Sequence, residues 1–127
     1  MTPNEIGTII VGAAIALHRE TGPGLLESVY EVVLAHDLQA HGLKVARQVP
    51  IPITIHGIQF DESFRADLVV EGKVLVELKS VEKVTKAHHK QVLTYLRLTG
   101  LKLGYLLNFG EALMKDGITR MIHGEIE

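Results

Sequence analysis

The sequence predicts an α/β fold in which helices flank one mixed β-sheet, and three observations carry this prediction. Two helical segments open the chain, two short apolar strands joined by a tight turn lie at its centre, and a strand, a helix and a strand follow in succession. The expected order of elements is α-α-β-β-β-α-β-β. At 127 residues, of which 46% are hydrophobic and 22% charged, the chain is expected to form a single domain, residues 1–127.

Composition and charge argue against several classes of protein. The chain has no cysteine, which excludes a disulfide framework and a thiolate metal site and is compatible with a reducing cytoplasm. A net charge of −2 argues against a protein that coats nucleic acid by bulk electrostatics. The apolar stretch from Ile6 to Leu17 is too short to span a bilayer and lacks the positive leader of a signal peptide. We therefore expect a cytoplasmic protein without a membrane partner.

The two N-terminal helices are predicted from their start and stop signals. Asn4 is a plausible N-cap for a first helix that runs to about Glu20, and Gly22-Pro23-Gly24 ends it. A second helix is expected from about Leu25 to Ala40, with Gly42 as its C-cap. Its apolar stripe is predicted to comprise Leu26, Val29, Val33, Leu34 and Leu38.

The next segment, Val45–Ile55, alternates between apolar and other residues and is predicted to be a strand. Pro50 and Pro52 share a parity, so the donors they remove lie along one side, and this strand should form an edge of the sheet. His56-Gly57 is expected to turn the chain, and Gln59 to Ser63 to lead into the central hairpin. One face of the strand should carry Val45, Val49, Ile51, Ile53 and Ile55.

The central hairpin has strands at Leu68–Val70 and Val74–Leu78, with a tight turn at Glu71-Gly72. A two-residue loop there would direct Asp67 and Glu77 to opposite faces of the sheet. A three-residue loop or a bulge shifts the register by one and brings both carboxylates to one face. We predict that irregularity, because the alternative buries one carboxylate without a partner.

The same hairpin concentrates charge. Asp67 and Glu77 are expected to lie roughly opposite one another, and like charges opposite each other normally destabilise a sheet. A divalent cation between them would remove that cost, and Lys79 follows Glu77 by two residues on the same face. The alternative is a pair of ordinary surface acids with Lys79 as a simple partner of Glu77.

The C-terminal half predicts a helix between two parallel strands. A helix is expected from about Thr85 to Leu98, followed by a buried strand at Leu103–Phe109 that runs parallel to Val74–Lys79. A last strand is expected at Ile118–Ile122. The helix should pack on the sheet through Val84, Val92, Leu93 and Leu96.

Charge is unevenly distributed along the chain. The segment from Lys79 to Lys102 has six basic residues and one acid, a net charge of +5, and the remainder carries −7. A local basic face is compatible with a ligand that bears phosphates. A solvated helix face is the alternative explanation.

These motifs together resemble those of a known superfamily. An acid on one strand, Glu-x-Lys on the next and then a helix, here Asp67, Glu77 and Lys79, resembles the PD-(D/E)xK nuclease superfamily. Gly24-Leu-Leu-Glu27-Ser-Val-Tyr30 is similar to the signature of the GxxExxY proteins, a little-characterised bacterial family placed in that superfamily. Four further blocks are similar to that family: Arg65-Ala-Asp-Leu68, Val76-Glu-Leu-Lys-Ser80, Gln91-x-x-x-Tyr95 and Asn108-Phe109-Gly110.

The resemblance implies a restriction-endonuclease-like core and a metal-dependent phosphodiesterase. Mg²⁺ or Mn²⁺ would be held by Asp67, Glu77 and the backbone carbonyl of Leu78, with Glu27 as a further ligand, direct or through water. Lys79 would orient or help deprotonate the attacking water. Substrate contacts are expected from Tyr30, Lys83, Lys86, Lys90, Gln91 and Tyr95.

Three functions stay open at this point. The leading hypothesis is a Mg²⁺-dependent nuclease acting on DNA. The second is a catalytically silent module that keeps the fold and binds nucleic acid or protein, and the third is the same enzyme core acting on RNA or another phosphodiester. A homodimer patch on the first helix is a further hypothesis, although the core would use the same residues equally well: Ile9, Ile10, Ala13, Ala14 and Leu17.

Overall fold

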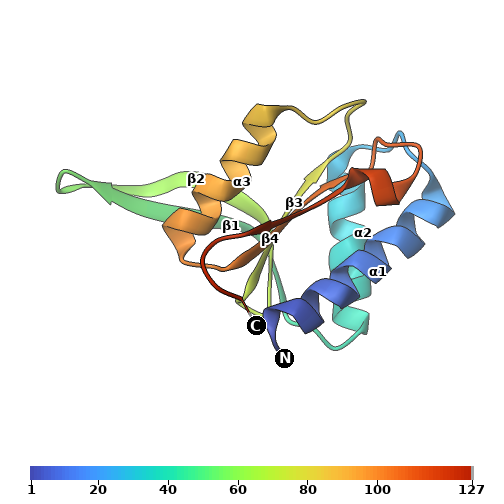
Figure 1. Cartoon of the computed structure of the whole chain (residues 1–127), viewed down its shortest axis with the longest axis horizontal. Helices are drawn as coiled ribbons and strands as arrows, with labels where there is room; N and C mark the ends of the chain where they lie inside the picture. Colours follow the sequence, from blue (N-terminus) through green and yellow to red (C-terminus); the bar gives the residue numbers. More distant parts are fainter. Residues whose placement is uncertain (127) are drawn as a thin grey trace.

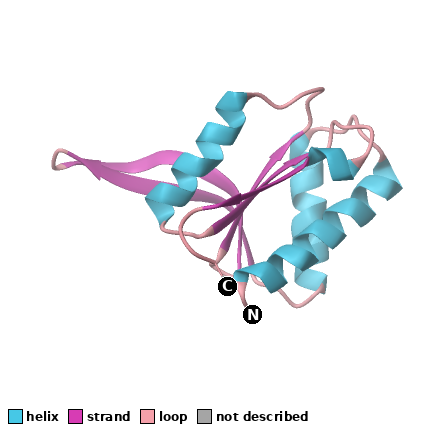
Figure 2. Cartoon of the chain, viewed as in Figure 1, coloured by secondary structure: helices cyan, strands magenta, loops and turns pink. Residues whose placement is uncertain are grey.

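The computed structural model describes residues 1–126. The elements are α1 (Pro3–Thr21), α2 (Glu27–Ala40), β1 (Val45–Ile55), β2 (Ile58–Val70), β3 (Val74–Lys79), α3 (Lys86–Thr99), β4 (Leu103–Asn108), the 3₁₀ helix η1 (Met114–Gly117) and β5 (Ile118–Ile122). This order confirms the prediction, with η1 added before the last strand (Figures 1 and 2). None of the helices within residues 1–126 is long and apolar enough to cross a membrane.

The strands form one mixed sheet in the order β1-β2-β3-β4-β5. Strands β3 and β4 are parallel and every other neighbouring pair is antiparallel, which confirms the crossover through α3. Strand β1 lies at an edge, as its two prolines predicted. Helices α1 and α2 cover one face of the sheet and α3 covers the other (Figure 1).

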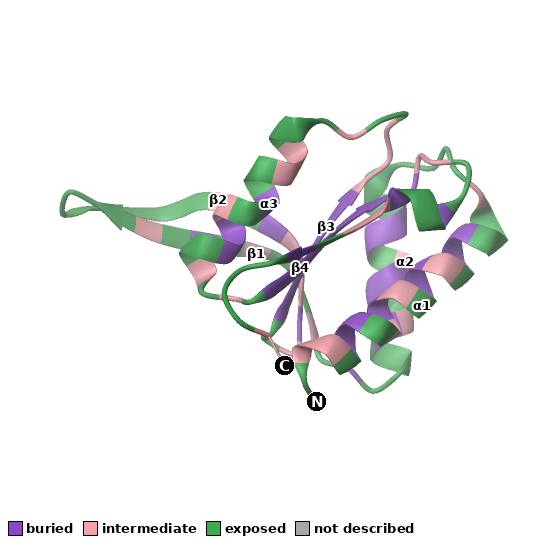
Figure 3. Cartoon of the chain, viewed as in Figure 1, coloured by how far each residue is buried: buried purple, intermediate pink, exposed green. Residues whose placement is uncertain are grey.

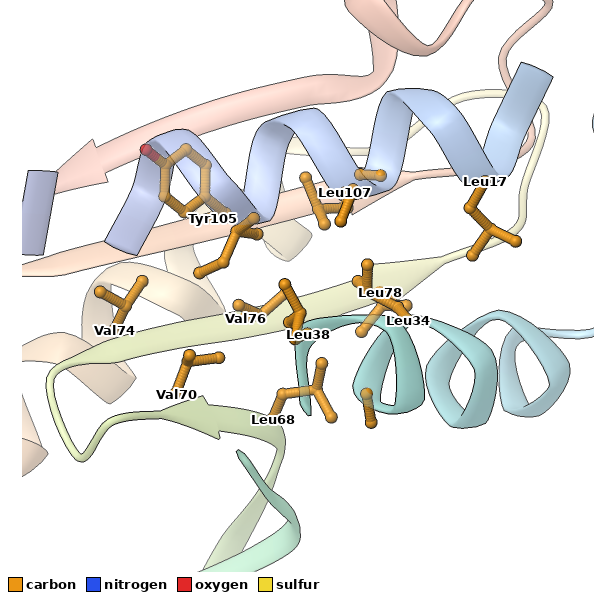
Figure 4. Packing of buried hydrophobic residues seen from close by; sticks show 14 of the residues in the cluster. Leu17, Leu34, Leu38, Leu68, Val70, Val74, Val76, Leu78, Tyr105 and Leu107 are labelled. Atoms are coloured by element: carbon orange, nitrogen blue, oxygen red, sulfur yellow. The ribbon is translucent and has the colours of Figure 1, made fainter. Parts of the chain in front are cut away.

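The larger core lies between the sheet and helices α1 and α2 (Figure 4). Leu17 of α1 and Leu34 and Leu38 of α2 pack against alternate residues of the central strands. Ile10, Ala13 and Ala14 of α1 are buried in this core too, and Ile9 packs against it. The residues of the suggested homodimer patch on α1 therefore serve the core of the monomer.

Two helix ends differ from the prediction. Helix α1 is capped by Thr2 instead of Asn4: the Thr2 hydroxyl accepts a hydrogen bond from the Glu5 N–H (3.2 Å), and the Glu5 carboxylate accepts one from the Thr2 N–H (2.9 Å). This reciprocal capping box, with Pro3 as the first helical residue, outcompetes Asn4. In α2 the C-cap is His41, and Gly42 follows it with a φ of 86°.

Three residues that were predicted to pack inward are exposed. Leu26 and Val29 are exposed, because α2 begins only at Glu27 and its inward face is centred on Leu34 and Leu38. Leu93 is exposed as well, since it lies about 100° around α3 from the buried Val92.

The first two strands form a long hairpin that projects from the body of the molecule (Figure 3). Strand β2 begins at Ile58, so Gln59–Ser63, predicted as a lead-in, is part of the strand. His56 and Gly57 make the turn with φ angles of 51° and 77°. The predicted turn is confirmed, and the predicted strand was too short.

The loop between β2 and β3 has the predicted irregularity. Val70 pairs with Val74, so the loop consists of the three residues Glu71, Gly72 and Lys73. Leu68 pairs with Val76, and this register puts Asp67 and Glu77 at the next pair of positions. The predicted shift by one residue is confirmed.

Both strands of the hairpin change the face they bury at Gln48. Val45 packs with the α1/α2 core but Val49 packs on the α3 side, although they share a parity. Leu68 and Ala66 of β2 differ in the same way. Gln48 has a φ of 51°, a left-handed conformation that re-aims a strand as a bulge does. The prediction that Val45 shares a face with the rest of β1 is therefore wrong.

Candidate active site

Asp67 and Glu77 meet where the hydrogen-bond ladder between β2 and β3 ends. The Leu78 N–H donates to one Asp67 carboxylate oxygen, Oδ2 (2.9 Å), and the Asp67 N–H donates to Glu77 Oε1 (3.1 Å). Each carboxylate thus accepts a hydrogen bond from a backbone N–H of the opposite strand. The geometry locks the two predicted acids together across the hairpin.

The environment of Glu77 disfavours its ionised form. The residue is 5% exposed, and burial together with the adjacent Asp67 carboxylate raises its pKa to about 9. The Lys79 ammonium acts in the opposite direction, which places its charge within reach of Glu77. Without a cation at this position the Glu77 carboxyl holds its proton at neutral pH.

The loop that follows Lys79 is anchored by a buried amide. Lys79 pairs with Asn108 of β4 in the parallel ladder. The Asn108 side chain accepts from the N–H of Val81 (3.1 Å), donates to the Val81 carbonyl (2.9 Å), and also accepts from the Gly110 N–H (3.0 Å). The Asn108-Phe109-Gly110 block therefore has a structural role: through Asn108 it anchors the loop beside the site.

Helix α3 contributes Tyr95 and Gln91. The Tyr95 ring stacks on Phe64 of β2 with 3.5 Å between ring centroids, and the Gln91 side chain lies beside its hydroxyl. Burial, with the charges of Glu77 and Asp67, raises the pKa of the Tyr95 phenol to about 12. Tyr95 therefore stays neutral near the carboxylates and keeps a hydroxyl that can donate a hydrogen bond.

Strand β1 and helix α2 supply a polar network that the sequence reasoning missed. The Gln48 amide donates to Glu31 Oε1 (2.6 Å) and to Asp67 Oδ1 (3.4 Å). Glu31 is 6% exposed and forms a salt bridge with Arg47 at 2.9 Å. The one available signal was that Glu31 lies four residues after Glu27, on the same helix face.

Glu27 begins α2 and lines a cavity of about 370 Å³ together with Asp67 and Leu78. The approach of α2 to the sheet is held by Ser80, whose hydroxyl donates to the Leu25 carbonyl (2.6 Å). The acid predicted from the helix and an acid predicted from the hairpin therefore share one cavity.

Tyr30 does not reach this cavity. It is 1% exposed, stacks on Phe109 with 4.3 Å between ring centroids, and donates its hydroxyl to the Gly22 carbonyl (2.6 Å). Its predicted role in substrate binding is corrected to a structural one, because the side chain points into the core and braces the loop before α2. Lys83, Lys86 and Lys90 are exposed on the loop after β3 and on α3.

The two carboxylates of Asp67 and Glu77 are suited to a hard divalent cation. Carboxylate oxygens are the ligands that Mg²⁺ and Mn²⁺ prefer, and the Asp67–Glu77 pair lacks the positive charge that two adjacent acids need. Within residues 1–126, however, no group of three or more His, Asp or Glu side chains is arranged to hold a metal ion. The Asp67–Glu77 pair therefore has the chemistry to bind such a cation. Glu27 lines the cavity but does not form a three-ligand group with the pair.

Comparison with known proteins agrees with this picture. A family model described as the PD-(D/E)XK nuclease superfamily matches residues 4–121. No curated protein and no solved structure matches the chain. The matched range contains all the site residues described above, and the narrower resemblance to the GxxExxY proteins stays a prediction.

Proposed function

The chain belongs to the PD-(D/E)XK nuclease superfamily, and we propose that it is a Mg²⁺- or Mn²⁺-dependent nuclease that hydrolyses DNA. The observation that carries the proposal is the Asp67–Glu77 pair, two carboxylates bound to each other's strands with one of them buried. Such a pair is costly unless a cation or a proton compensates it. In a nuclease site, a bound metal ion would supply this compensating charge.

Three oxygen-bearing groups would hold the ion: the Asp67 and Glu77 carboxylates and the Leu78 carbonyl. Glu27 would add a fourth, because it lines the same cavity as Asp67 and Leu78. When bound, a divalent ion lowers the pKa of a coordinated water and polarises the phosphate.

Lys79 would act beside the carboxylates on the attacking water. Its ammonium lies at the end of β3, close enough to Glu77 to lower the pKa of that carboxyl. From this position it would orient the water, help to remove its proton and offset the negative charge that develops on the phosphate.

The α3 side of the site would bind the substrate. The neutral Tyr95 hydroxyl and the Gln91 amide would hydrogen-bond the scissile phosphate, since Tyr95 lies beside the carboxylates and Gln91 beside Tyr95. Lys83, Lys86 and Lys90 are exposed at the same end of α3 and would contact backbone phosphates, which position a nucleic acid without specifying its sequence.

The first test is calorimetric titration of the wild type, Glu77→Gln and Glu20→Gln with Mn²⁺ and Mg²⁺. Binding by the wild type and by Glu20→Gln, an exposed acid on α1, together with its loss in Glu77→Gln, would support the metal site. No binding to the wild type at millimolar metal would count against it.

The second test separates catalysis from binding. Lys79→Ala should keep the fold and the Mn²⁺ affinity but lose cleavage by roughly a hundredfold or more on a panel of single- and double-stranded DNA and RNA. Cleavage of RNA alone would replace DNA as the substrate class. Metal binding without cleavage of any member of the panel would overturn the nuclease proposal.

One observation favours a second candidate, a binding module that retains the nuclease fold. The acids described within residues 1–126 do not gather into a three-ligand group. A module of this kind would bind nucleic acid or protein without turnover, so Lys79→Ala would weaken nucleic-acid binding without removing an activity.

A further inference from the structure

The outer part of the β1–β2 hairpin carries an apolar face. We define the outer hairpin as residues 53–60, in which Ile53 pairs with Phe60 and Ile55 pairs with Ile58. Opposite residues of an antiparallel pair project to one face and successive residues alternate. All four of these side chains therefore gather on a single face, while Thr54 and its partner Gln59 occupy the other.

This face continues an apolar surface that is covered elsewhere. Closer to the body, Ile51 pairs with Phe64, and Phe64 stacks under Tyr95 of α3. The pairing with β2 shifts by two residues between Ile51, opposite Phe64, and Ile53, opposite Phe60. An even shift keeps Ile53 and Ile55 on the face of Ile51, so the covered and uncovered residues belong to one stripe. Helix α3 ends at Thr99 and shelters only the inner part of the stripe.

The outer part of the stripe is bare in the monomer. Ile55, Ile58 and Phe60 are 50%, 60% and 47% exposed, and Figure 3 shows the projecting hairpin as almost wholly exposed. Leu98, three residues after Tyr95 on α3, is also exposed and extends the bare area toward the helix end. A two-stranded ribbon with an uncovered apolar face is marginal in water, and such a patch marks an interface.

Charge points to the class of partner. Asp61 and Glu62 border the outer hairpin, the Arg65 guanidinium forms a salt bridge with Glu62 (2.8 Å), and no Lys or Arg occurs between Arg47 and Arg65. The outer hairpin therefore offers no basic side chain to the phosphates of a nucleic acid or of an anionic membrane surface. A protein surface with basic residues beside apolar ones would complement it.

The chain itself offers that complementary surface. Helix α3 carries Arg97 in its last turn and no acidic residue, and it lies over the same stripe. Arg97 is next to the exposed Leu98 at the C-terminal end of the helix. One copy therefore presents an apolar ribbon bordered by Asp61 and an apolar helix end bordered by Arg97.

We propose that the outer hairpin is the interface of a homodimer. Two copies related by a two-fold axis would stack the apolar faces of their outer hairpins, about 10 Å apart as in other sheet-on-sheet contacts. Asp61 beside the outer hairpin of each copy would face Arg97 of the other. The proposal stands apart from the nuclease function, because none of these residues belongs to the site.

The first experiment measures the mass in solution by sedimentation velocity at micromolar concentration. Ile58→Asp and Gln59→Asp add the same charge to adjacent residues on opposite faces of the ribbon. We expect a dimeric wild type, a dimeric Gln59→Asp and a monomeric Ile58→Asp, with self-association weakened by roughly a hundredfold. Circular dichroism should find both variants folded, because Ile58 is 60% exposed in the monomer.

A second experiment uses the absence of cysteine from the chain. Ile55→Cys places a lone thiol on the apolar face, and Thr54→Cys places one on the polar face as a matched control. Mild oxidation should link Ile55→Cys into a covalent dimer several times faster than Thr54→Cys. A monomeric wild type, equal cross-linking of the two variants or an unchanged dimer in Ile58→Asp would each overturn the proposal, and a monomer would assign the face to a different protein.

Discussion

Two buried glutamates, Glu31 of α2 and Glu77 of β3, differ in the groups that surround their carboxylates. They are 6% and 5% exposed. Glu31 accepts hydrogen bonds from the Arg47 guanidinium (2.9 Å) and the Gln48 amide (2.6 Å). Glu77 accepts one from the Asp67 N–H (3.1 Å) and lies against the Asp67 carboxylate.

The difference separates an acid that the fold neutralises from one that it leaves uncompensated. Arg47 brings a positive charge to Glu31, and the salt bridge helps to fix α2 against β1. For Glu77, burial and the neighbouring carboxylate raise the pKa to about 9, with only partial relief from Lys79. A buried acid without a protein cation, beside a second acid, is the arrangement expected of a site that takes a cation from solution.

The largest expected effect comes from removing the compensated acid. Glu31→Ala leaves Arg47 and Gln48 without their acceptor and should lower the free energy of unfolding by about 2 kcal/mol. Glu77→Gln keeps a neutral acceptor for the Asp67 N–H and should change it by less than about 1 kcal/mol at pH 7. Urea unfolding in the presence of a chelator measures both. Equal losses of unfolding free energy in the two variants would contradict the distinction between a compensated Glu31 and an uncompensated Glu77.

The pH dependence of stability should sharpen the comparison. The folded state raises the Glu77 pKa from 4.5 to about 9, so folding takes up a proton between these values. The free energy of unfolding should therefore be greatest at the acidic end of this window and fall steadily as the pH rises toward 9. The groups that face Glu77 are Asp67, Lys79 and Tyr95.

The control for this slope is Glu77→Gln, which cannot ionise. Unfolding in chelator at a series of pH values should give a flatter profile for the variant than for the wild type. An identical slope in both proteins would assign the pH dependence to other groups.

A smaller effect is expected at Gln48, which joins the two regions. Gln48→Ala loses the amide bonds and keeps a left-handed backbone that Ala disfavours, whereas Gln48→Gly loses the bonds without that strain. The glycine variant should be more stable than the alanine variant by about 1 kcal/mol, as measured by urea unfolding. A less stable glycine variant would show that the φ of 51° is not maintained by the surrounding strands.

The smallest effect is expected from Arg47→Lys. Both Nε (3.2 Å) and Nη2 (2.9 Å) of Arg47 donate to Glu31, and a single ammonium cannot reproduce this fork. The variant should lose about 0.5–1 kcal/mol of unfolding free energy, because the charge remains and the side chain is partly exposed. Mn²⁺ affinity should be unchanged, and a loss of affinity would show that Arg47 is needed for metal binding.

Much of the fold followed from local sequence. The start of α3 after Thr85, its end at Gly100, the edge position of β1 and the parallel β3–β4 pair all rest on caps, prolines and periodicity, which act over a few residues. Even the three-residue loop after Val70 was predictable, because two carboxylates had to reach one face. The motif of Asp67, Glu77 and Lys79 was visible because short spacings on strands carry directions with them.

The rest depended on contacts that no local pattern encodes. Gln48 takes a left-handed φ that its residue type does not favour, and its amide bridges Glu31 and Asp67, which are 17 and 19 residues away. Tyr30 points inward because Phe109 lies beneath it, and Leu93 points outward because the sheet takes Val92 and Leu96. Periodicity states which residues share a face of one element. Only the packing of elements against each other decides which face is buried and which acid meets a cation.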